Sequence, residues 1–206
     1  MRWAMMAMFL VGCKEADTTF PEGLDPIEEN TANWPGTLSE AIETTGGDSG
    51  DHQWAHARAY IQADIADTYP CLREEMVNAD RREVASWTRD DDVEDGYEHS
   101  YRLNFLVENI IDLEFSDTWR HGSILDEQGA ITEIRSRWKM TEGNDFMFLK
   151  EGSIVTATPE SGWTSVDIVG HIDVAQGDEE TMISYITDMY ADIVACVSGD
   201  AYPTIK

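Results

Sequence analysis

Two histidines are the residues of this sequence whose type and position best suit chemistry. His99 and His121 fall on the apolar sides of two successive runs in which apolar and polar residues alternate. A neutral imidazole placed there can orient a ligand or act as a general acid or base. It is also a common hydrogen-bonded core residue, and both interpretations stay open. No His, Cys or carboxylate residues show the spacing of a recognised metal site, so we predict neither a metal nor a cofactor.

Aromatic residues gather on the same sides of these runs. Together with apolar residues at helical spacing near the C-terminus, they would enclose a surface with few polar groups, which is typical of a ligand pocket. An alternating sheet must bury such a face in any case, so a filled core is the other interpretation. The predicted cavity residues are Tyr97, His99, Tyr101, Phe105, Phe115, Trp119, His121, Trp138, Phe146, Met182, Ile186 and Met189.

The first residues have the order of a bacterial export signal. A positive charge at Arg2 precedes the apolar run 3–11 and the small residue Gly12. The segment Leu10-Val11-Gly12-Cys13 resembles the lipobox of bacterial lipoproteins, in which the cysteine is acylated and becomes the new N-terminus. The resemblance implies a protein held by lipid on Cys13 to a membrane of the cell envelope, on the extracytoplasmic side. A cytosolic protein with an apolar start is the alternative.

Lipid is the only membrane anchor that the sequence suggests. No later segment contains the roughly eighteen consecutive uncharged apolar residues of a transmembrane helix. The chain has three cysteines. With Cys13 assigned to lipid, Cys71 and Cys196 remain as an even pair in a compartment that permits disulfides. Spacing alone does not prove a bridge, and two buried free thiols are the alternative.

The charge of the chain excludes one class of partner. Asp and Glu number 41 against 14 Lys and Arg, for a formal net charge of −27. Such a chain repels nucleic acid and anionic headgroups, so no nucleic-acid partner is predicted. No feature of the sequence identifies a protein partner.

Composition and periodicity divide the chain into four parts. Residues 1–12 form the predicted signal peptide, 13–51 an acidic flexible linker, 52–199 a folded domain and 200–206 a C-terminal tail. The domain is predicted to open with a strand at 52–61, followed by short helices at 67–77 and 79–85. A strand near 84–89 and five alternating runs between 97 and 174 come next, and a helix ends the domain between the caps Asp178 and Gly199.

This order of elements resembles the START-like or Bet v 1-like superfamily, the helix-grip fold, which includes polyketide cyclase-like proteins. The residues that carry the resemblance are Ile65-Ala66-Asp67, Trp119-Arg120-His121-Gly122, Trp138 with Gly143, Glu151-Gly152-Ser153 and Gly170-His171. The resemblance implies an α+β fold in which a curved, seven-stranded antiparallel sheet wraps the C-terminal helix, with two short helices after the first strand. It also implies an apolar cavity between sheet and helix, and it would place Cys71 near Cys196.

The function that follows is binding rather than catalysis. We expect a membrane-anchored domain that holds a small hydrophobic molecule, such as a lipid, a sterol-like or a polyketide-like compound. One alternative is a polyketide cyclase-like enzyme with His99 or His121 as acid or base. The other is an envelope interaction module with a filled core and no ligand.

Overall fold

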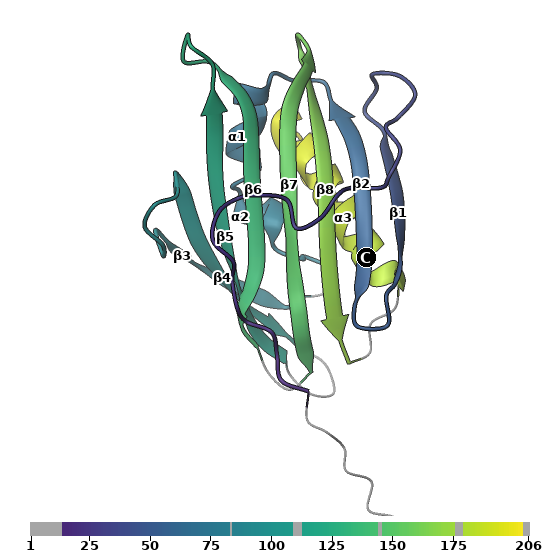
Figure 1. The fold of residues 1–206 in the computed structure, drawn as a ribbon, viewed down its shortest axis with the longest axis vertical. Coiled ribbons are helices and arrows are strands. Elements are labelled where there is room, and N and C mark those ends of the chain that lie inside the picture. The colour runs from purple at the N-terminus through teal and green to yellow at the C-terminus, as the bar shows by residue number, and fades with distance from the viewer. Residues whose placement is uncertain (1–13, 83, 109–112, 144–145, 176–178, 204–206) are drawn as a thin grey trace, which may run out of the picture.

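One antiparallel sheet wraps a long helix in the computed structural model, which describes residues 14–82, 84–108, 113–143, 146–175 and 179–203 (Figure 1). Its eight strands lie in the order β1-β2-β8-β7-β6-β5-β4-β3. The predicted α+β helix-grip architecture is therefore present. The elements are β1 (Ile42–Asp48), β2 (Gln53–Ile61), α1 (Ile65–Cys71), α2 (Glu75–Asn78), β3 (Ser86–Asp91), β4 (His99–Val107), β5 (Leu113–Leu125), β6 (Ile131–Glu142), β7 (Met147–Glu160), β8 (Trp163–Val174) and α3 (Glu179–Ser198).

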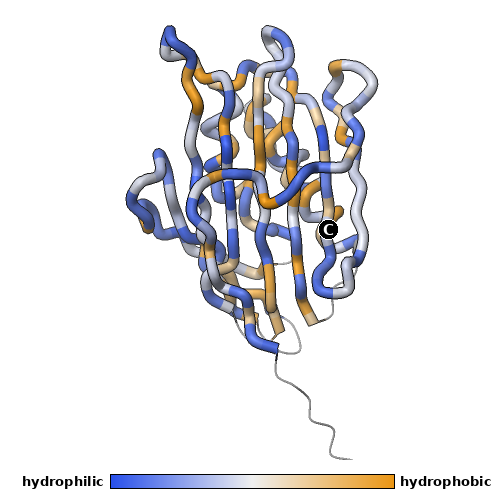
Figure 2. The backbone as a smooth tube through the Cα atoms, in the orientation of Figure 1, coloured by the Kyte–Doolittle hydropathy of each residue, from blue (hydrophilic) through white to orange (hydrophobic). Residues whose placement is uncertain are grey.

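The alternating sequence pattern explains which side of each strand is buried. Along β4, Tyr101, Leu103 and Phe105 are buried on the inner side, whereas Arg102 and Asn104 face outward. Figure 2 shows the same alternation as hydrophobic and hydrophilic bands along the strands. In β2 the inner residues are mostly alanines, whose small side chains let α3 pack closely against this strand.

The expected strand count of seven is wrong by one, because β1 forms within the segment predicted to be a flexible linker. Gly46 and Gly47 pair with Ala55 and Trp54 of β2. A Cβ atom on Gly46 would lie 2.8 Å from the Cδ1 atom of Ile183, so glycine permits α3 to approach the edge strand. A Thr-Gly run without apolar alternation gives no strand signal, which explains the error.

The chain before β1 crosses the outer face of the sheet, and we call residues 14–41 the strap (Figure 1). Acidic strap residues meet basic residues of the sheet. Asp17 lies 3.0 Å from Lys139, and Asp25 lies 2.7 Å from Arg135. Residue 13 lies outside the described residues, so the structure gives no test of lipid attachment.

The strap also contacts buried histidines. The Glu28 carboxylate lies 3.0 Å from Nε2 of His171, whose Nδ1 lies 3.5 Å from Glu151. Burial lowers the pKa of His171, but hydrogen bonds to Glu151 and Glu28 outweigh it and raise that pKa above 6.5. The His52 ring lies against the same ring, tilted by 34° with 4.3 Å between centroids, and the pKa of His52 is lowered by burial and by His171.

The His171 contact predicts a pH-dependent stability. A raised histidine pKa contributes stability that is present below pH 6.5 and lost as pH rises through the folded-state pKa. Between pH 6 and pH 9, the free energy of unfolding of the wild-type protein should therefore fall by about 1–2 kcal/mol more than that of His171→Gln, which is the contribution of a hydrogen bond to a charged group. Urea unfolding at the two pH values measures the difference. Equal losses in both proteins would contradict it.

The two short helices after the first long strand are confirmed, but their bounds differ from the prediction. The first begins at Ile65 after Asp64, earlier than the expected cap Asp67, and the second ends at Asn78. No helix forms at 79–82, where one was expected. The C-terminal helix ends as predicted, with Gly199 in the left-handed region at φ 70°. The expected cap Asp178 lies outside the described residues.

A disulfide joins Cys71 to Cys196, as the resemblance implied. It links the end of α1 to the last turns of α3, and the two cysteines are 125 positions apart in the sequence. The bridge fixes the short helices to the long one at one end of the domain. It therefore holds one boundary of the space between the sheet and α3.

Candidate ligand-binding site between the sheet and α3

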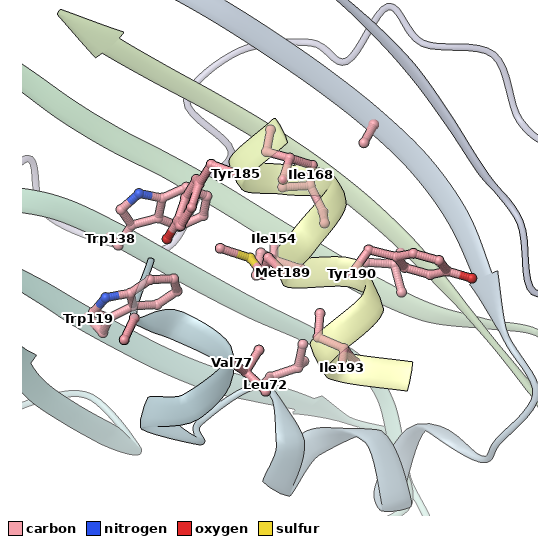
Figure 3. Packing of buried hydrophobic residues seen from close by; sticks show 14 of the residues in the cluster. Leu72, Val77, Trp119, Trp138, Ile154, Ile168, Tyr185, Met189, Tyr190 and Ile193 are labelled. Carbon is pink, nitrogen blue, oxygen red and sulfur yellow. The ribbon is translucent and has the colours of Figure 1, made fainter. Parts of the chain in front are cut away.

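Four aromatic rings line the inner face of β4, β5 and β6, and we call Tyr101, Trp119, His121 and Trp138 the aromatic wall. The Trp119 and Trp138 rings stack with centroids 4.8 Å apart and planes 17° apart. The His121 ring lies 6.0 Å from Trp119 and 5.4 Å from Tyr101, again nearly parallel. All four side chains are buried. The predicted aromatic face thus forms one continuous surface, and Figure 3 shows its two indoles facing α3.

Trp138 lies over the neighbouring strand because that strand has glycine at the contact. A Cβ atom on Gly152 would lie 2.0 Å from Cζ2 of Trp138, much closer than carbon atoms approach. A rigid indole has no flexible end that could move aside. Gly152 therefore positions one end of the aromatic wall.

A methyl group at position 152 should disturb this packing. Gly152→Ala is expected to lower the free energy of unfolding by about 1–3 kcal/mol through overpacking. Gly36→Ala is the matched control, because nothing lies within 4 Å of its added Cβ atom, and its effect should stay within about 0.5 kcal/mol. Urea unfolding measures both variants. Equal free energies of unfolding for the two variants would show that the contact between Gly152 and Trp138 does not affect stability.

The opposite side of the site is made by α3. Met182, Ile186 and Met189 are buried on the face of α3 that packs on the sheet. A Cβ atom on Gly170 of β8 would lie 2.0 Å from the terminal methyl of Met182, so helix and sheet are in close contact there. Tyr185 of α3 meets Trp138 edge-on at 6.3 Å. Side chains therefore fill the space between the wall and α3, and methionine is the residue type best able to rearrange there.

His121 is the most buried titratable group of the wall. Its Nδ1 atom lies 2.8 Å from Oγ of Ser136. Burial, followed by the charge of Arg73, lowers the pKa of His121 to about 3. The imidazole is therefore neutral at physiological pH. This neutral imidazole is better suited to form a hydrogen bond with a ligand than to donate a proton in a reaction.

His99 lies at the edge of the wall, where its side chain is 41 % exposed. It pairs with His121 across β4 and β5, and its Nε2 atom accepts a hydrogen bond from Arg73. Burial and the Arg73 charge lower the pKa of His99 as well. The two predicted histidines are thus neighbours, one inside the domain and one at its surface.

A buried ion pair lies on the same inner face. Nζ of Lys150 in β7 is 2.5 Å from Oδ2 of Asp117 in β5. The rings of Phe105, Phe115 and Tyr185 surround the ammonium group, with centroids 4.9 to 5.2 Å from Nζ. Burial raises the pKa of Asp117, and Lys150 opposes that shift. The second oxygen of Asp117 has no hydrogen-bond partner among the described residues.

Three polar atoms of the aromatic wall also have no hydrogen-bond partner within the described part of the chain. They are the indole nitrogens of Trp119 and Trp138 and Nε2 of His121. Figure 3 shows the two indole nitrogens on the same side of their rings, away from Met189. An indole N–H can only donate, and a buried donor without a partner costs about 1–3 kcal/mol. The inner face thus offers hydrogen bonds that these side chains do not use.

Comparison with known proteins finds likeness in structure and not in sequence. No family of known domains matches the chain, and no curated protein is similar to it. The human StarD13 (DLC2) lipid transfer and protein localization domain aligns with a TM-score of 0.52 at 11 % identity, over 85 % of this chain and 91 % of that one. The human StAR-related lipid transfer protein 5 aligns with the same TM-score at 12 % identity, over 85 % and 86 %. The chain has the START fold.

An aromatase/cyclase from Streptomyces, Zhui, is also similar, with a TM-score of 0.46 at 10 % identity over 72 % of this chain and 92 % of that one. The two human lipid-transfer domains, and not this weaker match, confirm the predicted START-like fold, apart from the added strand β1. Identities this low support the START fold alone, so ligand and activity must be argued from this chain's own residues.

Within the START fold, two predicted cavity residues lie away from the aromatic wall. The Tyr97 hydroxyl accepts a hydrogen bond from the strap residue Gly23, so this ring lies on the outer side. Phe146 lies in the turn before β7 and is 36 % exposed. Both residues lie just before a strand begins. The alternation of buried and exposed side chains, from which we predicted that they face inward, does not extend to these positions.

A surface pocket of about 490 Å³ is lined by two of the predicted cavity residues, Phe105 and Phe115, but by no residue of the aromatic wall. It opens where β3, β4 and β5 meet, and its polar lining includes Asn104, Glu114 and Ser116. Among the described residues, no cluster could hold a metal ion and no helix is long and apolar enough to cross a membrane. The aromatic wall and the buried ion pair remain the strongest candidate site.

Sequence reasoning missed Asp117 and Lys150. The signal was available for Asp117, because it stands between the inward residues Phe115 and Trp119 in strict alternation. A charged residue on a buried face requires a partner. Lys150 is harder to find, since it occurs two strands away in the sheet and only the folded structure brings it to Asp117.

Proposed function

We propose that the chain is a lipid-anchored, extracytoplasmic protein whose START fold binds a small hydrophobic molecule between the sheet and α3. The aromatic wall supports this proposal best. It joins a broad apolar surface to a few hydrogen-bonding groups, which is the composition of a small-molecule site. An apolar molecule bearing an oxygen acceptor would satisfy the indole donors of Trp119 and Trp138 that now lack partners.

Entry of a ligand requires side chains to move, because the wall and α3 are in contact. Met182 and Met189 of α3 belong to the same buried cluster as Trp119 and Trp138, and their unbranched side chains change rotamer readily. A ligand that displaces them would exchange one set of apolar contacts for another. The proposal therefore does not require an empty cavity in the unliganded protein.

Retention of a native compound tests the binding proposal. The full chain with Cys13→Ala would be purified without detergent, extracted with organic solvent and analysed by mass spectrometry. We expect one defined hydrophobic compound near one molecule per chain. Trp119→Phe keeps a ring but removes the N–H donor and should lower occupancy, whereas Trp34→Phe on the strap should not. Absence of any retained compound, together with no binding of added hydrophobic probes, would overturn the proposal.

Attachment through Cys13 is supported by the lipobox-like segment Leu10-Val11-Gly12-Cys13. Fractionation of bacteria that express the full chain tests it. Wild type should sediment with membranes and incorporate labelled palmitate, and Cys13→Ala should do neither. A Cys13→Ala protein that stays equally membrane-bound would contradict the assignment.

An enzyme of the polyketide cyclase type has less support from these residues. Acid–base catalysis works best with a group whose pKa lies near the working pH. The pKa of His121 is about 3, and that of His99 is also lowered. Binding without catalysis is therefore the function that the wall favours.

A further inference from the structure

Basic side chains in this acidic protein almost all have acidic partners. Within the described part of the chain, ten of twelve lie within 4.0 Å of a carboxylate, and the exceptions are Arg73 and Arg137. Arg137 is covered by the strap and donates to the main-chain oxygen of Asp25. Arg73 thus has no carboxylate partner among the described residues, although the net charge of the chain is −27.

The contacts of Arg73 are with neutral groups. It lies between α1 and α2, with its guanidinium 4.7 Å from the centroid of the Tyr69 ring. Its Nη1 atom donates to Nε2 of His99, which leaves the hydrogen of that imidazole on Nδ1. Its Nε atom is buried and has no hydrogen-bond partner among the described residues. Arg73 therefore has one donor without an acceptor, and His99 presents a second donor beside it.

Other charged groups near Arg73 do not neutralise it. Arg89 donates to the main-chain oxygen of Arg73 at 2.8 Å and forms its own ion pair with Asp91. The acidic side chain of Glu98 lies 4.0 Å from Nε2 of His99. Its carboxylate accepts hydrogen bonds from the main-chain nitrogen and the hydroxyl of Ser123, at 2.9 and 2.7 Å. The local excess of positive charge also lowers the pKa of His99, after burial.

This cation lies at the edge of the aromatic wall. His99 is the cross-strand partner of His121, and Tyr101 stacks on His121 with 5.4 Å between centroids. The Arg89 guanidinium also lies over the Tyr101 ring, 4.1 Å from its centroid. A molecule that occupied the wall and extended past His121 would bring its end to Arg73 and His99.

We propose that Arg73 and His99 bind the carboxylate of an amphipathic carboxylic acid whose hydrocarbon part lies against the aromatic wall. The inference rests on the proposed function and names the class of ligand. A carboxylate would accept hydrogen bonds from Nε of Arg73, which lacks an acceptor among the described residues, and from Nδ1 of His99. Charge-assisted hydrogen bonds of this kind are short and strong. A monoanion matches the one guanidinium at this site.

Isothermal titration of the full chain with two probes of equal length tests the class. Dodecanoate and dodecanol differ only in the head group, and titration at physiological salt screens the general repulsion of anions by this protein. Arg73→Gln should weaken dodecanoate binding about tenfold or more, the loss of about 1.4 kcal/mol, and leave dodecanol unchanged. Arg102→Gln is the control, because it removes the same charge from an exposed pair with Glu142 on the outer face. It should change neither probe.

The outcomes separate the two proposals. Binding of neither probe would contradict the proposed function itself. If both probes bind and Arg73→Gln leaves both affinities unchanged, or weakens both equally, the carboxylate proposal alone would be overturned. A second measurement needs only the wild-type chain: the carbon-13 NMR signal of bound, carboxyl-labelled dodecanoate is followed as the pH changes. It should show a pKa lowered by the guanidinium, and a carboxyl that titrates as it does in water would contradict the proposal.

Discussion

Removing the disulfide is expected to lower the free energy of unfolding by about 4–5 kcal/mol, the largest change we predict for a pair of substitutions. Cys71 and Cys196 lie 125 residues apart. In the chain-entropy account, a bridge stabilises by restricting the unfolded chain, and its effect grows with the length of the closed loop. This bridge also fixes α1 to α3 at one end of the proposed site.

Urea unfolding of Cys71→Ala/Cys196→Ala measures the effect, with Cys13→Ala as a common background so that no other thiol differs. Wild type unfolded with a reductant should fall to the same stability as the double variant. A loss below about 1 kcal/mol would show that the bridge contributes little to the fold.

The second large loss of stability is expected from breaking the buried ion pair between Lys150 and Asp117. Lys150→Met removes the cation and leaves Asp117 buried with its charge unpaired, which typically costs about 3–5 kcal/mol. Burial alone then acts on Asp117 and raises its pKa further above 3.8. A carboxyl whose pKa is raised by folding favours the folded state at low pH and opposes it as pH rises. The loss of unfolding free energy in Lys150→Met, relative to wild type, should therefore be larger at pH 7.5 than at pH 4.5.

Two further variants make the ion-pair test specific. Lys150→Met/Asp117→Leu removes both charges and should recover much of the lost stability, because a packed apolar pair replaces a buried ion pair at little cost. Arg102→Met breaks an exposed pair with Glu142 and should cost under about 1 kcal/mol. A Lys150→Met deficit that is small or independent of pH would contradict the buried pair.

Periodicity predicted most of the fold because most strands have one buried face. In β4, β5 and β6 the buried face is aromatic, and these strands lie where the alternation placed them. The Thr-Gly segment of β1 has no such pattern, yet it pairs with β2, and Gly46 leaves room for Ile183 of α3. Acidic composition indicated a linker for the strap, whereas its carboxylates meet basic residues spread over several strands, which no local pattern encodes.

The candidate site was predictable where it depends on local alternation. Tyr101, Trp119, His121 and Trp138 were expected on one face, and they form the aromatic wall. Tyr97 and Phe146 lie at strand ends, where the facing of a side chain depends on the turn. The contact of Arg73 with His99 joins a helix connection to a distant strand, so only the folded structure reveals it.

The most direct test of the central claim observes the aromatic wall itself. Indole N–H signals of the full chain can be followed by nitrogen-15 NMR, with Trp119→Phe and Trp138→Phe to assign the two signals of the wall. On addition of dodecanoate or of a compound extracted with the native protein, both signals should shift as their donors gain an acceptor, whereas the exposed Trp34 should stay in place. Shifts confined to Trp34, or none at all, would contradict ligand binding between the sheet and α3.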